Sequence, residues 1–223
     1  MRGMLLLLVT LTTSVAFAQY DEDEGPPKLE GTNRISVVGG WRYAPNTTFY
    51  NNYYSAEAHQ GLSRSRGSFG GPALTATFGY SATNLIEVVG DAFASYERMK
   101  LTGQPGLNAV TYGVMLGLRF QKRFEVGPAG LIPSVGALVG PHIAAAYFDG
   151  GRAVENGGTG FALTAGATLR LTPTWGLCFE FREIFARGEV EDFGYYNAGG
   201  SWLAAGVTYT FPWEPERKIN GRL

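Results

Sequence analysis

Apolar residues alternate with small or polar residues along most of this chain, in runs of about ten residues. In the run that ends at Phe211, every second residue from Leu203 onward is apolar, and those between are alanine, glycine or threonine. A period of two is typical of a β-strand with one apolar face. The apolar face ends in Tyr209 and Phe211, beside a polar tail, as expected where a strand leaves hydrocarbon for a headgroup layer.

Eight segments of this kind can be recognised: 34–43, 71–80, 85–96, 109–120, 131–148, 159–171, 175–187 and 199–211. Most are near the length that crosses a bilayer at a tilt, and the connections between them alternate roughly between long and short. An even number of strands closes without an exposed edge. The pattern therefore predicts an all-β fold, an eight-stranded antiparallel up-and-down transmembrane β-barrel over residues 34–211, with Pro141 at a bulge or near the rim.

The alternation fits two kinds of barrel, which differ in the face that is apolar. A soluble lipocalin-like barrel would have to fit its many aromatic side chains into a lumen that eight strands barely leave open. The strand segments contain almost no lysine, and aromatic residues gather at both of their ends, as in the two girdles of a membrane barrel. We therefore expect the apolar face to point outward, with exposed Leu116, Leu118, Leu163, Leu169, Phe179 and Val207.

Composition and the N-terminus indicate export. Arg2, an apolar run and Ala16-Phe17-Ala18 resemble a signal peptide over residues 1–18, with the cell outer membrane as destination. Residues 19–33 are expected to form a flexible acidic periplasmic leader, and residues 212–223 a short polar periplasmic tail. Charged residues are only 17% of the chain, and the net charge of −1 gives no reason to expect nucleic acid. Cys178 is the only cysteine, so an internal disulfide is excluded.

The whole pattern, with the terminal Val207-Thr208-Tyr209-Thr210-Phe211, resembles the OmpA/OmpX-like eight-stranded bacterial outer-membrane β-barrels. The resemblance covers the transmembrane domain only, since just a short tail follows it and no peptidoglycan-binding domain. It implies that Val207, Tyr209 and Phe211 form a C-terminal signal for the barrel-assembly machinery. It also implies inward ion pairs that plug the lumen.

Six charged residues fall on the non-apolar face of their strands: Glu87, Asp91, Arg119, Arg170, Glu180 and Arg182. An arginine facing lipid near the bilayer midplane would cost roughly 2–4 kcal/mol, so inward placement is favoured. Inside a narrow lumen an unpaired charge is also costly, and guanidinium groups can bridge carboxylates. Pairing would indicate a closed scaffold, whereas separately solvated charges would leave room for a pore.

Candidate chemistry is sparse. The two histidines, His59 in the first long loop and His142 near a rim, lack a nearby serine and carboxylate, and no nucleophile-elbow, zinc or phosphate-loop motif is present. We expect no catalytic, cofactor or metal site, and a lipid-modifying enzyme is the least favoured reading. The expected function is a monomeric scaffold in outer-membrane lipids that presents loops 44–70 and 188–198 to an extracellular ligand. The alternative is a narrow passive pore for ions or small solutes.

Overall fold

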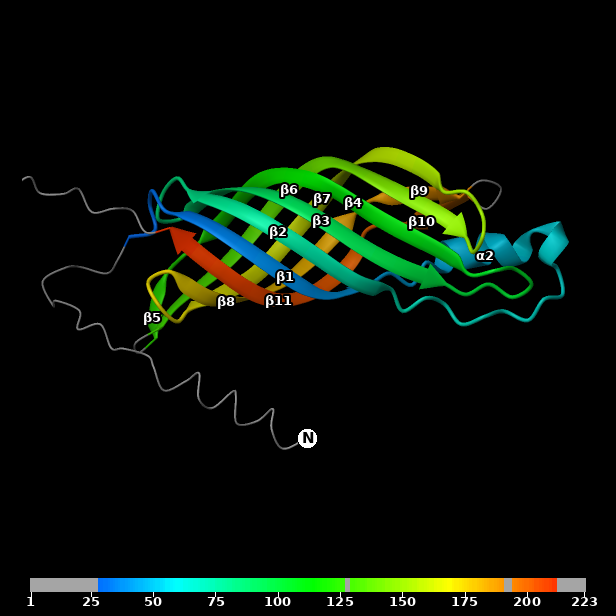
Figure 1. The fold of residues 1–223 in the computed structure, drawn as a ribbon, viewed down its shortest axis with the longest axis horizontal. Coiled ribbons are helices and arrows are strands. Elements are labelled where there is room, and N and C mark those ends of the chain that lie inside the picture. The colour runs from blue at the N-terminus through cyan, green and yellow to red at the C-terminus, as the bar shows by residue number, and fades with distance from the viewer. Residues whose placement is uncertain (1–27, 127–128, 191–193, 212–223) are drawn as a thin grey trace, which may run out of the picture.

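The computed structural model describes residues 28–126, 129–190 and 194–211, which form a closed antiparallel β-barrel (Figure 1). Eight strands build the wall: β1 (Asn33–Tyr43), β2 (Gly71–Ser81), β3 (Ile86–Met99), β4 (Leu107–Gln121), β6 (Ala129–Phe148), β7 (Val154–Arg170), β8 (Trp175–Phe185) and β11 (Gly200–Phe211). Their order is β4-β3-β2-β1-β11-β8-β7-β6, and β6 pairs with β4 to close the ring. The predicted eight-stranded barrel is confirmed.

The strands are strongly staggered around the barrel. Following paired residues from Asn33 leads through every strand to Ser201, and from there back to β1 at Tyr43. The path thus returns ten residues farther along the same strand. Such a stagger requires strands that tilt against the barrel axis, typically by roughly 35–45°, which is the diagonal course seen in Figure 1. An eight-stranded barrel of this kind is just wide enough for side chains to fill.

The apolar face of the strands points outward, as predicted. Along β2, residues alternate strictly between buried and exposed. Of the six residues expected outside, five are exposed, among them Leu116 at 69% and Phe179 at 58%, while Leu169 is half-buried. Aromatic side chains stand outward near both strand ends, for example Trp41 and Tyr43 at one and Trp175 and Phe211 at the other.

The two ends of the barrel differ in the connections they carry. At one, the loop end, lie α2 (Thr47–Ser55), the 3-10 helix η1 (Glu57–His59), and the hairpin of β9 (Arg187–Val190) and β10 (Gly194–Asn197). The other, the turn end, carries the short turns and β5 (Phe124–Val126), which pairs with the start of β6 (Figure 1). In the part of the chain described, neither helix is long and apolar enough to cross a bilayer.

Several segments expected as loops are more ordered than the sequence indicated. The loop expected at 97–108 is shortened at both ends, because β3 continues to Met99 and β4 begins at Leu107. Likewise, β7 already begins at Val154. The expected loops 44–70 and 188–198 contain α2 and the β9–β10 hairpin. The added strand residues lack a clear apolar period because they project beyond the apolar belt of the barrel. There, backbone pairing alone defines the strand.

Pro141 does not sit at a bulge, which was one of the two places expected for it. The register between β4 and β6 is unchanged on both sides of it, from Gly113–His142 to Leu116–Val139. The two residue pairs between these are missing from the ladder. Because proline has no N–H to donate, the strand keeps its course and loses pairing locally instead.

The end of the expected leader is packed against the turn end. Residues 1–27, including the expected signal peptide, and the tail 212–223 lie outside the described residues. The backbone N–H groups of Leu29 and Glu30 donate to the side-chain oxygen of Asn84 in the β2–β3 turn, at 2.8 and 3.2 Å. Leu29 and Thr32 are buried there. Residues 29–32 are therefore part of the folded barrel rather than of a flexible leader.

Candidate functional site

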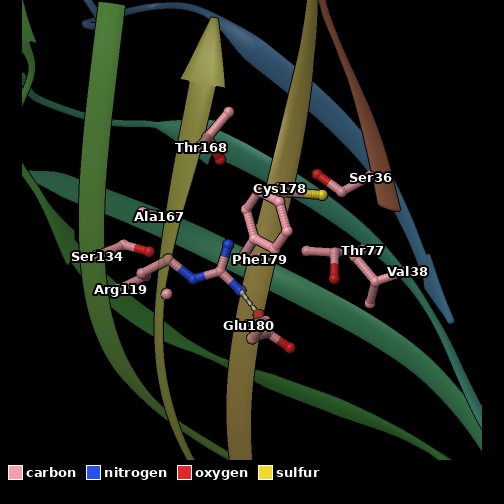
Figure 2. A pocket seen from close by; sticks show the side chains of 11 residues that line it. Ser36, Val38, Thr77, Arg119, Ser134, Ala167, Thr168, Cys178, Phe179 and Glu180 are labelled. Carbon is pink, nitrogen blue, oxygen red and sulfur yellow. Dashed lines mark hydrogen bonds and ion pairs between the residues drawn. The ribbon is translucent and has the colours of Figure 1, made fainter. Parts of the chain in front are cut away.

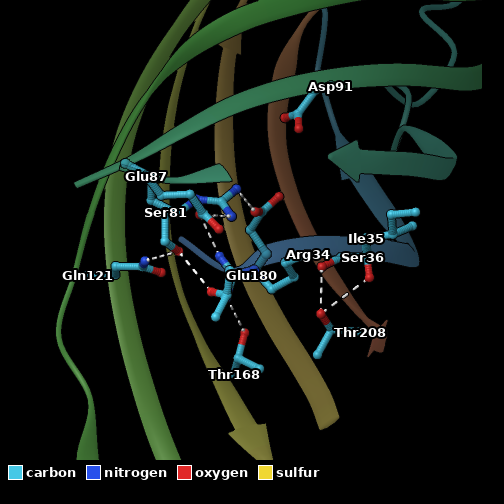
Figure 3. A network of polar contacts seen from close by, with 12 residues as sticks. Arg34, Ile35, Ser36, Ser81, Glu87, Asp91, Gln121, Thr168, Glu180 and Thr208 are labelled. Carbon is cyan, nitrogen blue, oxygen red and sulfur yellow. Dashed lines mark hydrogen bonds and ion pairs between the residues drawn. The ribbon is translucent and has the colours of Figure 1, made fainter. Parts of the chain in front are cut away.

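A continuous series of ion pairs fills the lumen on its turn-end side (Figure 3). Its five contacts are Arg34–Glu87 (2.5 Å), Glu87–Arg119 (3.3 Å), Arg119–Glu180 (3.1 Å), Glu180–Arg182 (2.7 Å) and Arg182–Asp91 (2.6 Å). We call these six residues the lumen network. Five of the six residues expected in a lumen charge cluster belong to it.

The lumen network crosses the barrel from wall to wall. Strands β3 and β8 are opposite each other, since three strands separate them in either direction around the ring. The contact between Arg182 on β8 and Asp91 on β3 therefore spans the diameter, and Arg119–Glu180 spans nearly as much. Because side chains from opposite walls meet, the network acts as a cross-brace and occupies the passage.

Burial explains why these charges are paired. The side chains of Glu87 and Arg182 are each only 1% exposed. A charge taken out of water is costly unless an opposite charge and hydrogen bonds compensate it. Each guanidinium is planar and bridges two acceptors: Arg119 joins two glutamates, and Arg34 donates to Glu87 and to the hydroxyl of Thr168 at 3.2 Å.

Arg170 is absent from the lumen network and Arg34 is an additional member of it. Arg170 is buried but remains at the turn end, where it donates to the carbonyl oxygen of Pro173. Arg34 joins the lumen network although it was not among the expected members. Its position could have revealed it, because it shares the inward phase of Ser36 and Thr208 on the neighbouring strand.

A small polar cavity adjoins the lumen network (Figure 2). Measured as space for the centre of a water molecule, it has a volume of about 20 Å³, room for about one water. Its lining includes Arg119, Glu180, Cys178 and the hydroxyl-bearing residues Ser36, Thr77, Ser134 and Thr168. Cys178 is buried, and its thiol faces this polar space rather than lipid. A cavity of this size does not form a passage.

Toward the loop end, the interior contains a buried apolar cluster, with the buried polar side chains of Thr75, Ser95 and Thr111 beside it. Phe93 and Trp202 pack edge to face with ring centroids 5.9 Å apart. Buried around them in the same cluster are Val89, Met115, Leu138, Ala162 and Ile184. A closely packed apolar layer excludes water and ions. It is a second layer that fills the lumen.

A further buried ion pair, separate from the lumen network, lies nearer the loop end. It joins Arg42 on β1 to Glu97 on β3. Arg42 also donates to the carbonyl oxygens of Ala198 and Gly199, and the amide of Asn46 donates to Glu97. The side-chain oxygen of Asn46 accepts from the backbone N–H of Asn197 at 2.6 Å. These contacts form a latch that ties the first and last long connections to two strands.

The helix α2 and the β9–β10 hairpin cover the latch. Phe49, Tyr50 and Tyr53 are at most 1% exposed, and Phe49 packs edge to face on Tyr196 of β10 at 6.5 Å. Burial, with a contribution from the carboxylate of Glu97, raises the pKa of Tyr50 to about 12. We call this aromatic cluster, with the latch beneath it, the cap. Segment 44–70, expected as a loop, thus contributes the helix α2 to a lid over the latch.

The histidines are engaged in structural contacts. His59 stacks on Tyr53 with ring centroids 4.0 Å apart, and its Nδ1 lies 3.1 Å from the carbonyl oxygen of Tyr53. His142 is buried, and its Nε2 donates to the carbonyl oxygen of Arg187 at 3.1 Å. Among the residues that the structure describes, no three His, Cys, Asp or Glu side chains converge to hold a metal ion.

The expected assembly signal lies on the outer face of the last strand. Val207 and Phe211 are exposed and Tyr209 is half-exposed. Tyr209 packs edge to face against Trp175 and Phe211, each at 4.9 Å between centroids. The side chains of Val207, Tyr209 and Phe211 thus form one outward row at the turn end.

Comparison with known proteins gives structural matches alone. No protein-family model and no curated protein matches the chain. Neisserial surface protein A aligns at a TM-score of 0.53 with 19% identity, covering 82% of this chain and 100% of that one. The outer membrane protein OprG from Pseudomonas aeruginosa aligns at 0.53 with 11% identity, covering 84% and 99%. Ail of Yersinia pestis aligns at 0.47 with 15% identity, covering 82% and 99%. With its closed ring and outward apolar face, the chain has the fold of the eight-stranded outer-membrane β-barrels.

Proposed function

We propose that the protein is a closed outer-membrane barrel that acts as a rigid scaffold and presents its loop-end surface outside the cell. The single observation that carries this proposal is the lumen network, because it spans the barrel from β3 to β8 and leaves a cavity for about one water. The apolar layer and the cap support it further. A pore would need a continuous polar passage, and three successive layers oppose one.

The scaffold role also fits the form of the loop end. A lid built on α2 and a β-hairpin offers a fixed rather than a floppy surface, and a preorganised surface binds a partner at a smaller entropic cost. Exposed Asn51, Asn52 and Tyr195 on this lid are suited to contact an extracellular ligand. The barrel closes within one chain through the pairing of β4 with β6, which supports action as a monomer. The role requires no catalytic group.

Placement in the outer membrane, with the loop end outside, can be tested by labelling of intact cells. In a Cys178→Ser background, we expect Ser63→Cys at the loop end to react with a membrane-impermeant maleimide. Thr172→Cys in the β7–β8 turn should react only after the outer membrane has been permeabilised. Both positions are exposed in the structure, so a difference in reactivity reports the compartment.

The labelling experiment has two informative failures. Reaction of Thr172→Cys, and not Ser63→Cys, on intact cells would reverse the proposed orientation. Equal protection of both positions before permeabilisation would place the loop end away from the cell surface and refute the scaffold role.

A further inference from the structure

We infer that Arg64, Arg66 and Lys100 form a binding surface for lipid headgroups that bear phosphate and a net negative charge, here called the cationic rim. The inference rests on the proposed placement in the outer membrane and adds a ligand class to it. Arg64 and Arg66 lie in the part of the first long connection that returns from α2 toward β2, and Lys100 directly follows β3 (Figure 1).

Hydrogen bonds bring the three cations together from two separate connections. Ser65, which lies between the two arginines, donates its hydroxyl to the carbonyl oxygen of Lys100 at 2.6 Å. The phenol oxygen of Tyr54 accepts the backbone N–H groups of Ser65 and Thr102, at 3.0 and 3.1 Å. These contacts hold the backbones of the two connections beside each other, and so place Lys100 next to the segment that carries Arg64 and Arg66.

Neighbouring aromatic residues indicate the level of the cationic rim along the barrel axis. The indole N–H of Trp41 donates to the carbonyl oxygen of Phe69 at 2.8 Å, and the ring of Phe69 is 68% exposed. On β3, Tyr96 faces outward, and Lys100 follows it in the same outward phase. Outward aromatic girdles mark the level of the headgroups. The flexible cationic side chains just above them reach that layer.

Within residues 28–126, 129–190 and 194–211, no carboxylate neutralises the cationic rim. All three side chains are exposed, and none lies within 4.0 Å of a carboxylate of the described residues. Arg98 on the same face differs, because it pairs with Asp149 at 2.5 Å. Arg64 donates to the side-chain oxygen of Asn51 at 2.6 Å, a neutral acceptor that leaves its charge uncompensated.

The surroundings favour a lipid over a soluble anion. Exposed Phe69 and Leu62 lie on the same returning segment as the arginines, so apolar and cationic groups are presented together. A phosphorylated lipid uses both, since its headgroup meets the cations while its acyl chains lie along the apolar barrel wall. Phosphate recognition by clustered arginine and lysine is governed by charge and by the fork geometry of the guanidinium.

The test is native mass spectrometry of the purified, refolded full chain in detergent with phosphatidylglycerol or lipid A, and with phosphatidylethanolamine as the lipid without net charge. We expect the anionic lipids to bind preferentially, and R64Q/R66Q to bind them about tenfold more weakly. The charge-preserving R64K/R66K should retain most binding. R152Q/R187Q, an equal loss of charge elsewhere at the loop end, should bind as the wild type does. A heat-induced shift in gel mobility confirms that each variant is folded.

Each alternative outcome contradicts the inference while leaving the scaffold proposal intact. Equal binding of charged and neutral lipids by the folded protein would do so. Equal losses in R64Q/R66Q and R152Q/R187Q would show that only overall charge matters. Displacement of the lipid by millimolar inorganic phosphate would indicate a free anion as the ligand. If the folded protein prefers anionic lipids but the cysteine labelling gives one of its two contrary results, the proposed placement in the outer membrane is refuted and the lipid preference stands.

Discussion

The charged residues of one strand differ in which side chains compensate their charge. On β8, Glu180 faces the lumen and contacts two arginines, whereas Glu183, three positions on, faces outward and accepts from Ser201 at 2.5 Å. The inward phase of Glu180 could be read from the alternation. The individual partners could not be predicted: Arg119 meets Glu180, and Asp91 meets Arg182, from strands that are distant in sequence. These contacts depend on the curvature and stagger of the closed sheet.

Glu180→Gln is expected to destabilise the folded barrel by about 3 kcal/mol, because it leaves Arg119 and Arg182 short of a buried counter-charge. The measurement is reversible urea unfolding in lipid vesicles, followed by tryptophan fluorescence. Glu183→Gln on the same strand is the matched control, and should change the free energy of unfolding by about 1 kcal/mol or less. Equal effects of the two substitutions would show that the lumen network is not a stabilising element.

Tyr54 is expected to ionise at a lower pH than Tyr50 and Tyr196. Burial alone would raise the pKa of its phenol, but hydrogen bonds from Ser65 and Thr102 outweigh that effect and lower it to about 8. Burial raises the pKa of Tyr196 to about 12. Ultraviolet absorbance should show a tyrosine transition near pH 8 in the wild type that is lost in Tyr54→Phe. Tyr50→Phe should keep the early transition.

The sign of the stability effect follows from this depressed pKa. Because the folded state holds the Tyr54 phenolate better than the unfolded state does, ionisation stabilises the contact between the first two long connections as pH rises above about 8. The contribution is lost as pH falls through that value. Proteolysis of segment 44–70 should therefore slow between neutral and alkaline pH in the wild type, and show no such change in Tyr54→Phe.

The elements of the barrel wall and those of its loop end are determined by different forces. The strands were predictable because each carries its own apolar period. The helix α2 was not: its sequence is rich in threonine and asparagine, poor helix formers, and the side chain of Asn46 does not cap it. Its helical form depends on packing of Phe49, Tyr50 and Tyr53 over the barrel mouth, a tertiary effect outside any local pattern.

The latch is expected to hold α2 in place. Glu97→Gln removes the buried counter-charge of Arg42, so local opening of the cap should become easier. Hydrogen exchange of the amides of α2, followed by mass spectrometry, should become at least about tenfold faster. Glu87→Gln, on the same strand but in the lumen network, should leave exchange in α2 unchanged. Slow exchange in both variants would show that aromatic packing alone secures the cap.

As a whole, the molecule is a membrane barrel closed by three layers: the lumen network, the apolar layer and the cap. The lumen network braces β3 against β8, the apolar layer packs around Phe93 and Trp202, and the cap covers the mouth. The sequence predicted that the apolar face of the strands points outward and that charged residues point into the lumen. The cap did not, since it is assembled from connections that become neighbours only when the ring closes.

The most direct test of a closed lumen is the conductance of the purified, refolded protein in a planar bilayer. Gel mobility of the same preparation establishes folding, and a large-pore porin added afterwards shows that the bilayer reports channels. The account predicts a baseline current without discrete openings over a wide range of voltage, because ions would have to displace the lumen network and cross the apolar layer. Stable, regularly sized openings by the folded wild-type protein would contradict it.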